Sequence, residues 1–337
     1  MTQPQVSIVM GSYNGARYIE RQLNSLVNQT VPPHEILVAD DGSTDETMEI
    51  VAAIAAKSAV PIRLWRNPEN LGYGENFLQT ALKATGDLIA YCDQDDIWRP
   101  TKLEKCIPEF ADPNVVMVVH QAGLIDGEDN NIGGFDQGIS ESRTVPPLSY
   151  DQLKCFYGFS IMIRRDLLAV IPPNLRGTDP MSGAATMAHD RWTTFLANLA
   201  GSTREIAEEL VDYRQHNDNL CGAPVGRFYL GNASTIRTWS DIYVRAAREQ
   251  RALLDRIEPE VMVQFPQLDI AAAKALRDAV VKKGEGRDRV YQARGRIGAL
   301  ARIVGNLFNG TYVQVGSGRF MAQRLAKDVL FIGMRRD

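Results

Sequence analysis

Short apolar runs alternate with amphipathic segments along the first 120 residues. The apolar runs predict strands at residues 6–10, 35–39, 62–65 and 88–92. Between them, apolar residues recur every three or four positions, which predicts helices at residues 15–28, 43–56 and 73–84. Ser43 and Glu46 have the spacing of a capping box at the start of the second helix. Such alternation is typical of a mostly parallel sheet flanked by helices, so we predict an α/β, Rossmann-like fold.

The pattern changes in the second part of the chain. Residues 121–150 are rich in Gly, Asp, Asn and Pro and predict a long loop, a feature that is often functional. Apolar runs resume at Phe156, and residues 187–199 predict a helix that begins near His189. Beyond residue 225 the pattern is helical, with breaks predicted at the glycines of 284–286 and 316–318.

We therefore divide the chain into a body, residues 1–224, and a helical extension, residues 225–337. Charge supports this division, since the body has 17 basic and 30 acidic residues and the extension has 20 and 11. An acidic body attracts cations, whereas a basic extension attracts anionic partners. A solvated charged helix is the simpler interpretation of the extension.

Two stretches of the extension combine an apolar side with basic residues. The first contains Ile297, Leu300, Val304 and Leu307 near Arg294, Arg296 and Arg302. The second contains Phe320, Leu325, Val329 and Ile332 near Arg319, Arg324 and Lys327. Basic amphipathic helices bind anionic membranes, so we expect peripheral membrane contact through residues 287–337. Packing on the body, or on a second copy in a homo-oligomer, is the alternative.

Composition indicates the cellular setting. The four cysteines, Cys92, Cys106, Cys155 and Cys221, form no CxxC pair and are typical of a reducing compartment. The N-terminus has no pattern of a secretion signal, and no run of about 18 apolar residues predicts a membrane-spanning helix. We expect a cytoplasmic protein, or one bound at the inner face of the cell membrane, without a nucleic-acid partner.

Three carboxylates follow the last strand of the first 120 residues. Asp93, Asp95 and Asp96 would repel one another unless a cation neutralised them. Mg²⁺ and Mn²⁺ prefer oxygen ligands, and Mg²⁺ is commonly shared between one or two carboxylates and substrate phosphates. The motif therefore indicates a diphosphate site with a divalent cation, and a solvated acidic turn is the alternative.

Polar residues also follow the first and second strands. The carboxyl ends of parallel strands meet at one edge of a sheet, so Ser12, Tyr13 and Asn14 should lie near Asp40 and Asp41. One aspartate could accept the imide N–H of uracil or thymine, and Tyr13 could stack on the base. Turn formation and loop packing are the alternatives.

The sequence contains no GxGxxG and no GxxxxGK[ST] element. Dinucleotide oxidoreductases and P-loop kinases are therefore disfavoured. If phosphates bind here, a metal must neutralise them.

Four segments, in this order and at this spacing, resemble the family 2 glycosyltransferases of GT-A fold. They are residues 6–14 (VSIVMGSYN), 38–45 (VADDGSTD), 67–72 (NPENLG) and 91–98 (YCDQDDIW). The resemblance implies an inverting enzyme whose nucleotide-sugar half is about 1–120 and whose acceptor half is about 121–224. It implies donor-binding roles for Ser12, Tyr13, Asn14, Asp41, Asn70, Gly72, Asp93 and Gln94. Asp93 and Asp95 would also hold the metal, and Asp96, an extra acid beside them, would share that coordination.

Inversion needs a base that takes the proton of the acceptor hydroxyl. In this family that acid begins a helix about 100 residues after the metal motif, and Asp190 fits. Its alternative role is that of a first-turn acid of the helix. Trp192 either faces the acceptor or packs, and Gly158 and Phe159 resemble the segment before the acceptor site.

Residues 213–219 (YRQHNDN) resemble a stretch found in bacterial rhamnosyltransferase-like members of the family. Asn217 and Asp218 depart from that pattern. The resemblance implies that His216 completes the metal shell or binds diphosphate, and that Arg214 assists the diphosphate. A lone histidine is otherwise often a structural residue.

The sequence thus predicts a hexosyl- or rhamnosyltransferase with a dTDP- or UDP-sugar donor and Mg²⁺ or Mn²⁺. Its acceptor would be a glycan or a lipid-linked saccharide of bacterial surface polysaccharide synthesis. A haloacid-dehalogenase-like phosphatase also has a strand-end Asp-x-Asp, but it leaves the residues around Asp41 and Asp190 unexplained. A non-catalytic glycan or nucleotide binder would need neither a metal motif nor a base.

Overall fold

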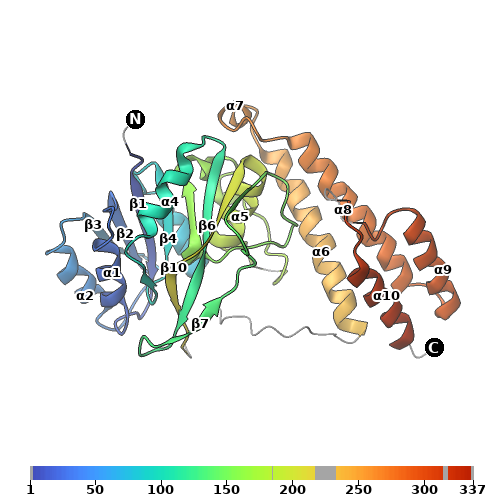
Figure 1. The fold of residues 1–337 in the computed structure, drawn as a ribbon, viewed down its shortest axis with the longest axis horizontal. Helices are drawn as coiled ribbons and strands as arrows, with labels where there is room; N and C mark the ends of the chain where they lie inside the picture. Colours follow the sequence, from blue (N-terminus) through green and yellow to red (C-terminus); the bar gives the residue numbers. More distant parts are fainter. Residues whose placement is uncertain (1–2, 184, 217–232, 314–317, 335–337) are drawn as a thin grey trace.

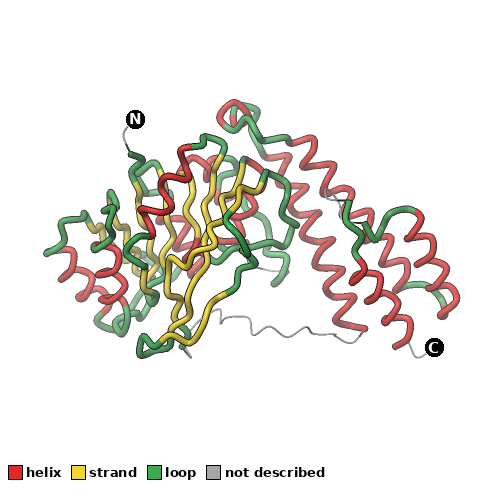
Figure 2. Tube along the Cα trace, in the orientation of Figure 1, coloured by secondary structure: helices red, strands yellow, loops and turns green. Residues whose placement is uncertain are grey.

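The computed structural model describes residues 3–183, 185–216, 233–313 and 318–334. An α/β body and a helical extension lie side by side along the long axis of the molecule (Figure 1). Figure 2 shows the strands of the body gathered into one sheet with helices on both faces. The predicted α/β class is confirmed. The expected boundary between residues 224 and 225 lies outside the described residues.

The first half of the sheet is parallel, as predicted. It contains β1 (Val6–Ser12), β2 (Glu35–Asp40), β3 (Ile62–Arg66) and β4 (Leu88–Cys92), in the order β3-β2-β1-β4. Successive side chains of a strand point to opposite faces, so Val9 packs on one face and Ile8 and Met10 on the other. Strands such as β1, β2 and β4 are buried on both faces and are therefore apolar runs in the sequence.

Helices cover both faces of this sheet. On one face lie α1 (Ile19–Val27), α2 (Thr47–Ala55) and α4 (Lys102–Cys106). On the other face lie α3 (Tyr73–Ala81) and α5 (His189–Ala200). The helices predicted at 15–28, 43–56, 73–84 and 187–199 are therefore present, with somewhat different bounds.

The second half of the sheet is mixed. β9 (Ile161–Arg164) lies antiparallel between β4 and β6 (Val115–Ile125), and β10 (Ser202–Arg214) runs parallel to β6. β5 (Ile97–Trp98) and β8 (Arg143–Val145) pair with β10, and β7 (Asn131–Phe135) pairs with β6.

The loop predicted at residues 121–150 is therefore wrong. β6 continues to Ile125, and both β7 and β8 fall within this range. Four of the five residues of β7 are exposed, so this strand has no apolar pattern and is held by its pairing with β6.

The extension contains an antiparallel pair, α6 (Ala233–Leu253) and α8 (Ile270–Tyr291), connected through α7 (Val261–Gln264). α9 (Gly295–Phe308) and α10 (Ala322–Met334) pack at its far end (Figure 1). The break predicted at 284–286 is wrong, because α8 continues through it. A Cβ on Gly284 would lie 2.1 Å from Val244, so this glycine allows α8 to approach α6 closely. Residues 316 and 317 of the other predicted break lie outside the described residues.

The extension shares a hydrophobic core with the body. Side chains between α6 and α8 join the cluster that contains Trp192 of α5; they are Leu253, Leu254, Ile257, Phe265 and Leu268. Among the described residues, no helix is both long enough and apolar enough to cross a bilayer.

A buried carboxylate connects the helices of the extension. Asp328 of α10 is fully buried and pairs with Arg287 of α8 at 2.6 Å. The hydroxyls of Tyr291 and Tyr312 donate hydrogen bonds to the same carboxylate at 2.5 and 2.9 Å. The charge of Asp328 is therefore fully compensated.

We expect the substitution Asp328→Ala to lower the free energy of unfolding by about 3–5 kcal/mol, because it leaves Arg287 buried without its counter-charge. Urea unfolding followed by circular dichroism measures the change. Glu285→Ala is the control, since the ion pair of Glu285 with Arg248 is exposed and should contribute less than about 1 kcal/mol. Equal losses in both variants would contradict this account.

Candidate active site

A glutamine side chain joins the segments that follow β1 and β4. The Gln94 amide accepts a hydrogen bond from the Tyr13 N–H and donates one to the Tyr13 carbonyl, both at 3.0 Å. A Cβ on Gly15 would lie 2.1 Å from Gln94 Oε1, so glycine is needed to leave room. Gln94, expected to bind the donor, holds these two segments together, while the Tyr13 side chain stays 51% exposed.

The carboxylate of Asp41 organises the loop that follows β3. Oδ1 accepts hydrogen bonds from the Asn67 amide at 2.9 Å and from the Leu71 N–H at 2.8 Å, and Oδ2 accepts one from the Gly72 N–H at 2.8 Å. The Asn70 amide donates to the Asp41 carbonyl at 2.8 Å. Asn70 and Gly72 are therefore held against Asp41, whose role toward a nucleobase stays a prediction.

The turn after β2 is built by side chains of two neighbouring segments. The Ser43 hydroxyl donates to the buried Asp40 and accepts the Asn14 N–H at 2.8 Å. The capping box predicted at Ser43 is wrong, because the helix begins only at Thr47. The Ser12 hydroxyl is also buried and donates to Asp40 at 3.4 Å. Ser12 and Asn14 thus support the turn in this structure.

The three carboxylates after β4 do not have equal positions. Asp93 and Asp95 are half-buried, whereas Asp96 is fully buried and accepts the Arg214 N–H at 3.0 Å. Burial, followed by the charges of Asp95 and Asp93, raises the pKa of Asp96. Asp96 therefore lies behind the other two, and its expected share in metal binding does not fit this position.

Two buried cations lie behind the acidic motif. Arg214 donates from Nε to the Asp95 carbonyl at 2.6 Å and is fully buried, so the structure gives it a supporting position instead of the predicted contact with diphosphate. Lys102 donates to the Phe159 carbonyl at 2.6 Å and lies 3.5 Å from the centre of the Trp98 ring. Burial lowers the pKa of Lys102 to about 8, and the neighbouring acids oppose this shift.

Asp95 and His216 form a contact between the end of β4 and the end of β10. His216 Nε2 lies 2.8 Å from Asp95 Oδ2, and its ring stacks on Tyr18. In the described part of the chain, no three His, Cys, Asp or Glu side chains are gathered closely enough to hold an ion alone. One carboxylate and one imidazole fit a divalent cation that takes its other ligands from a diphosphate.

Asp190 lies in the first turn of α5, close to the acidic motif. It is partly exposed, and its Oδ1 accepts the Arg191 N–H at 2.6 Å. Burial, followed by the charges of Asp95 and Asp190, raises the pKa of Asp93. The structure therefore brings the expected base and the expected metal ligands together, although they are about 95 residues apart in the sequence.

His189, next to Asp190, is a buried residue that the sequence did not single out. Its ring stacks on the Phe77 ring, with 4.1 Å between the two ring centres. Neither ring nitrogen has a hydrogen-bond partner among the described residues. Burial lowers its pKa to about 4, so the imidazole is neutral near pH 7. A Cβ on Gly158 would lie 2.4 Å from His189 Nε2, so Gly158 makes room for this ring.

The residues expected to bind an acceptor are buried. Trp192 is 0% exposed and Phe159 is 1% exposed, and both pack in the hydrophobic cores. Gly158 is also buried, in a 3-10 turn that precedes β9. Trp192 thus takes the packing role that was its alternative, and neither it nor Phe159 presents side-chain surface to a sugar in this structure. Their contact with an acceptor, and that of Gly158, stays a prediction.

Comparison with known proteins identifies the family of the part of the chain that contains β1, β2, β4 and the acidic motif. The model for glycosyl transferase family 2 matches residues 7–171. These residues are a family 2 glycosyltransferase domain. Two relatives of this chain are uncharacterized glycosyltransferases. The one from Nostoc is 31% identical over 219 residues, 64% of this chain and 66% of that protein. The one from Haemophilus influenzae is 29% identical over 180 residues, 53% of this chain and 70% of that protein.

Solved structures with a similar fold extend the comparison beyond the matched domain. The structure of Staphylococcus aureus TarS residues 1–349 with UDP has a TM-score of 0.54 at 17% identity. The match covers 97% of this chain and 89% of TarS. At this level of identity the likeness shows a shared GT-A fold.

Proposed function

We propose that this chain transfers a sugar with inversion from a dTDP- or UDP-sugar to a glycan or lipid-linked saccharide in bacterial surface polysaccharide synthesis. The sugar would be a hexose or rhamnose. The observation that carries the proposal is the convergence of Asp95 and His216 with Asp190 at one edge of the sheet. A binder needs no base there, and a phosphatase does not account for Asp190.

The donor site would lie across the ends of β1, β2 and β4. The exposed ring of Tyr13 has a face on which a base can stack. The loop held by Asp41 lies beside it and brings Asn70 and Gly72 to the same edge. TarS, which shares the fold, has been solved with UDP and with UDP-GlcNAc, and this supports a nucleotide-sugar donor.

Asp95, His216 and Asp93 are the residues that would hold Mg²⁺ or Mn²⁺. The cation would supply positive charge that stabilises the departing diphosphate. The charge of Lys102 opposes part of the acidic charge from behind, while Arg214 hydrogen-bonds the Asp95 carbonyl and pairs with Asp129. Arg214 would act on the diphosphate only by fixing the backbone of Asp95.

Asp190 would take the proton of the acceptor hydroxyl. As the hydroxyl oxygen bonds to the anomeric carbon, the bond from that carbon to the diphosphate breaks and the nucleoside diphosphate leaves. The hydrogen bond from Arg191 and the helical first turn hold the Asp190 carboxylate in place. The buried ring of His189 lies beneath this turn and fixes its packing on Phe77.

The membrane contact expected for the extension concerns mainly α9. One side of α9 packs inward through Ala299 and Ile303. Its other side exposes large apolar residues, namely Ile297, Leu300, Val304, Leu307 and Phe308. Arg294, Arg296 and Arg302 are exposed on the same segment.

On α10 the predicted apolar side is divided, since Ile332 is buried and Val329 is exposed. We propose that α9 lies on an anionic membrane surface, where the acceptor would be carried.

The substitution Asp95→Ala should abolish metal-dependent donor binding. Removal of a residue that only hydrogen-bonds a metal ligand lowers metal affinity by roughly 10–100-fold, so loss of a ligand itself should lower it further. Calorimetric titration of UDP- and dTDP-sugars, with and without Mn²⁺, measures the effect. Glu260→Gln removes an exposed carboxylate of the extension and is the control. If Asp95→Ala keeps the metal response, Asp95 is not a ligand.

The substitution Asp190→Asn should leave donor affinity within about twofold and lower kcat by roughly 10²–10⁴-fold, because only proton removal is lost. Release of nucleoside diphosphate measures turnover, with water as acceptor until the natural acceptor is found. A normal rate would remove Asp190 as the base. Release of inorganic phosphate by the unmodified protein would favour the phosphatase.

The double substitution Ile297→Asp with Phe308→Asp should reduce binding to phosphatidylglycerol-containing vesicles at least tenfold. Each side chain is more than 80% exposed, so the fold should persist, while burial of each in lipid would contribute about 1.5–3 kcal/mol. Co-sedimentation at low salt measures binding, and Ile132→Asp on exposed β7 is the control. Unchanged sedimentation, or loss of a dimer in light scattering, would contradict the membrane contact.

A further inference from the structure

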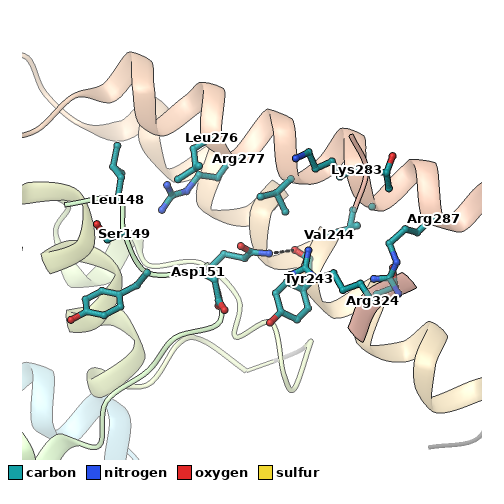
Figure 3. Close-up of a pocket in the computed structure, with 16 residues that line it drawn as sticks. Leu148, Ser149, Asp151, Tyr243, Val244, Leu276, Arg277, Lys283, Arg287 and Arg324 are labelled. Carbon is teal, nitrogen blue, oxygen red and sulfur yellow. Dashed lines mark hydrogen bonds between the residues drawn. The ribbon is translucent and has the colours of Figure 1, made fainter. Parts of the chain in front are cut away.

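A cavity lies between the body and the helices of the extension, beside the core that they share. It is lined by the body segment 148–152 and by residues of α6, α8 and α10 (Figure 3). The cavity volume is about 60 Å³. On the same scale, one water molecule needs roughly 10–15 Å³, so the cavity is large enough for a phosphate group.

Arg277 of α8 lines this cavity and carries a buried charge. Its side chain is 2% exposed and points from α8 toward Leu148 and Ser149 (Figure 3). Nε and Nη1 have no hydrogen-bond partner, and no carboxylate pairs with this guanidinium, within the described ranges. Burial lowers the pKa of Arg277 to about 10, with no compensating charge.

Arg287, on the same helix and lining the same cavity, shows how such a charge is normally accommodated. Its side chain is 11% exposed and pairs with Asp328, and this pairing outweighs burial and raises its pKa. An arginine does not escape burial by losing its proton at neutral pH, so Arg277 needs an anion as well. Among the residues that the structure describes, Asp328 pairs with Arg287, and no acid pairs with Arg277.

The remaining charged groups of the cavity do not supply this anion. Lys283 donates to the Val313 carbonyl at 2.5 Å, and the Arg324 guanidinium lies 5.1 Å from the centre of the Tyr243 ring. Asp151, the acid among the lining residues, interacts with Tyr243. The lining thus carries more positive than negative charge after Asp328 is counted with Arg287.

We propose that this cavity is a phosphate-binding site in which Arg277 holds a phosphate group between α8 and the body. The planar guanidinium fork matches two phosphate oxygens, and Ser149 and Gln152 line the same space. The site is separate from the one at Asp95 and does not depend on sugar transfer. Its ligand ties the extension to the body, since the cavity is formed by both.

Thermal unfolding of the full chain in inorganic phosphate tests the site. We expect a saturable rise in Tm of about 2–4 °C over a chloride buffer of equal ionic strength, since a ligand that binds only the folded state stabilises it. Arg277→Gln should remove this rise, and Arg277→Lys should weaken phosphate binding about tenfold because the fork is lost. Arg289→Gln, an exposed arginine of the same helix, should keep the rise.

An equal phosphate response in Arg277→Gln would overturn the proposal, as would the absence of any response in the unmodified chain. If Arg277→Gln does not fold, the phosphate affinity of Arg277→Lys is the deciding measurement. An affinity equal to that of the unmodified chain would overturn the proposal. The source of the phosphate is distinguished with vesicles of phosphatidylglycerol in phosphatidylcholine. A lipid headgroup predicts that Arg277→Gln sediments several-fold less than the unmodified chain and that free phosphate competes. A free anion predicts equal sedimentation of both.

Discussion

The repulsion between the carboxylates at the end of β4 is the constraint on which the site depends. Asp93, Asp95 and Asp96 follow a buried strand, where low polarity strengthens every interaction between charges. Lys102 lies behind them, fully buried, and its charge opposes the rise in the pKa of Asp93 and Asp96. Arg214, also fully buried, holds the backbone of the motif and pairs with Asp129. The cation proposed above would supply positive charge from the open side.

The fold brings the partners of this motif together from distant segments. β10 carries Arg214 and His216 back to the end of β4, and α5 carries Asp190 to the same edge. Antiparallel β9 separates the parallel strands β1–β4 from β6 and β10, which places the second half of the sheet beside the first. The residues proposed for base recognition, metal binding and proton removal therefore come from three parts of the chain that meet only when the sheet is complete.

The sequence was sufficient for the strands that are buried on both faces and for the helices between them. It was insufficient for β7 and β8, because their polar residues resemble a loop and only their pairing reveals a strand. Gly284 suggested a break but serves the contact with Val244. The acidic motif was found from its charges and its place after a strand, and Asp190 by resemblance, whereas Lys102 and His189 were not assigned a role. A lone lysine or histidine gives no signal of burial, which depends on neighbours from elsewhere in the fold.

The paired hydrogen bonds between Gln94 and Tyr13 have a consequence for any ligand that spans the site. They behave like one rung of a sheet and fix the spacing between the segments after β1 and β4 before a ligand arrives. A molecule with a different distance between its ring and its anionic group would have to break both bonds, at about 1 kcal/mol each. Under the proposed function, the site would select a donor by its length as well as by its charge, through a side chain that need not touch the donor.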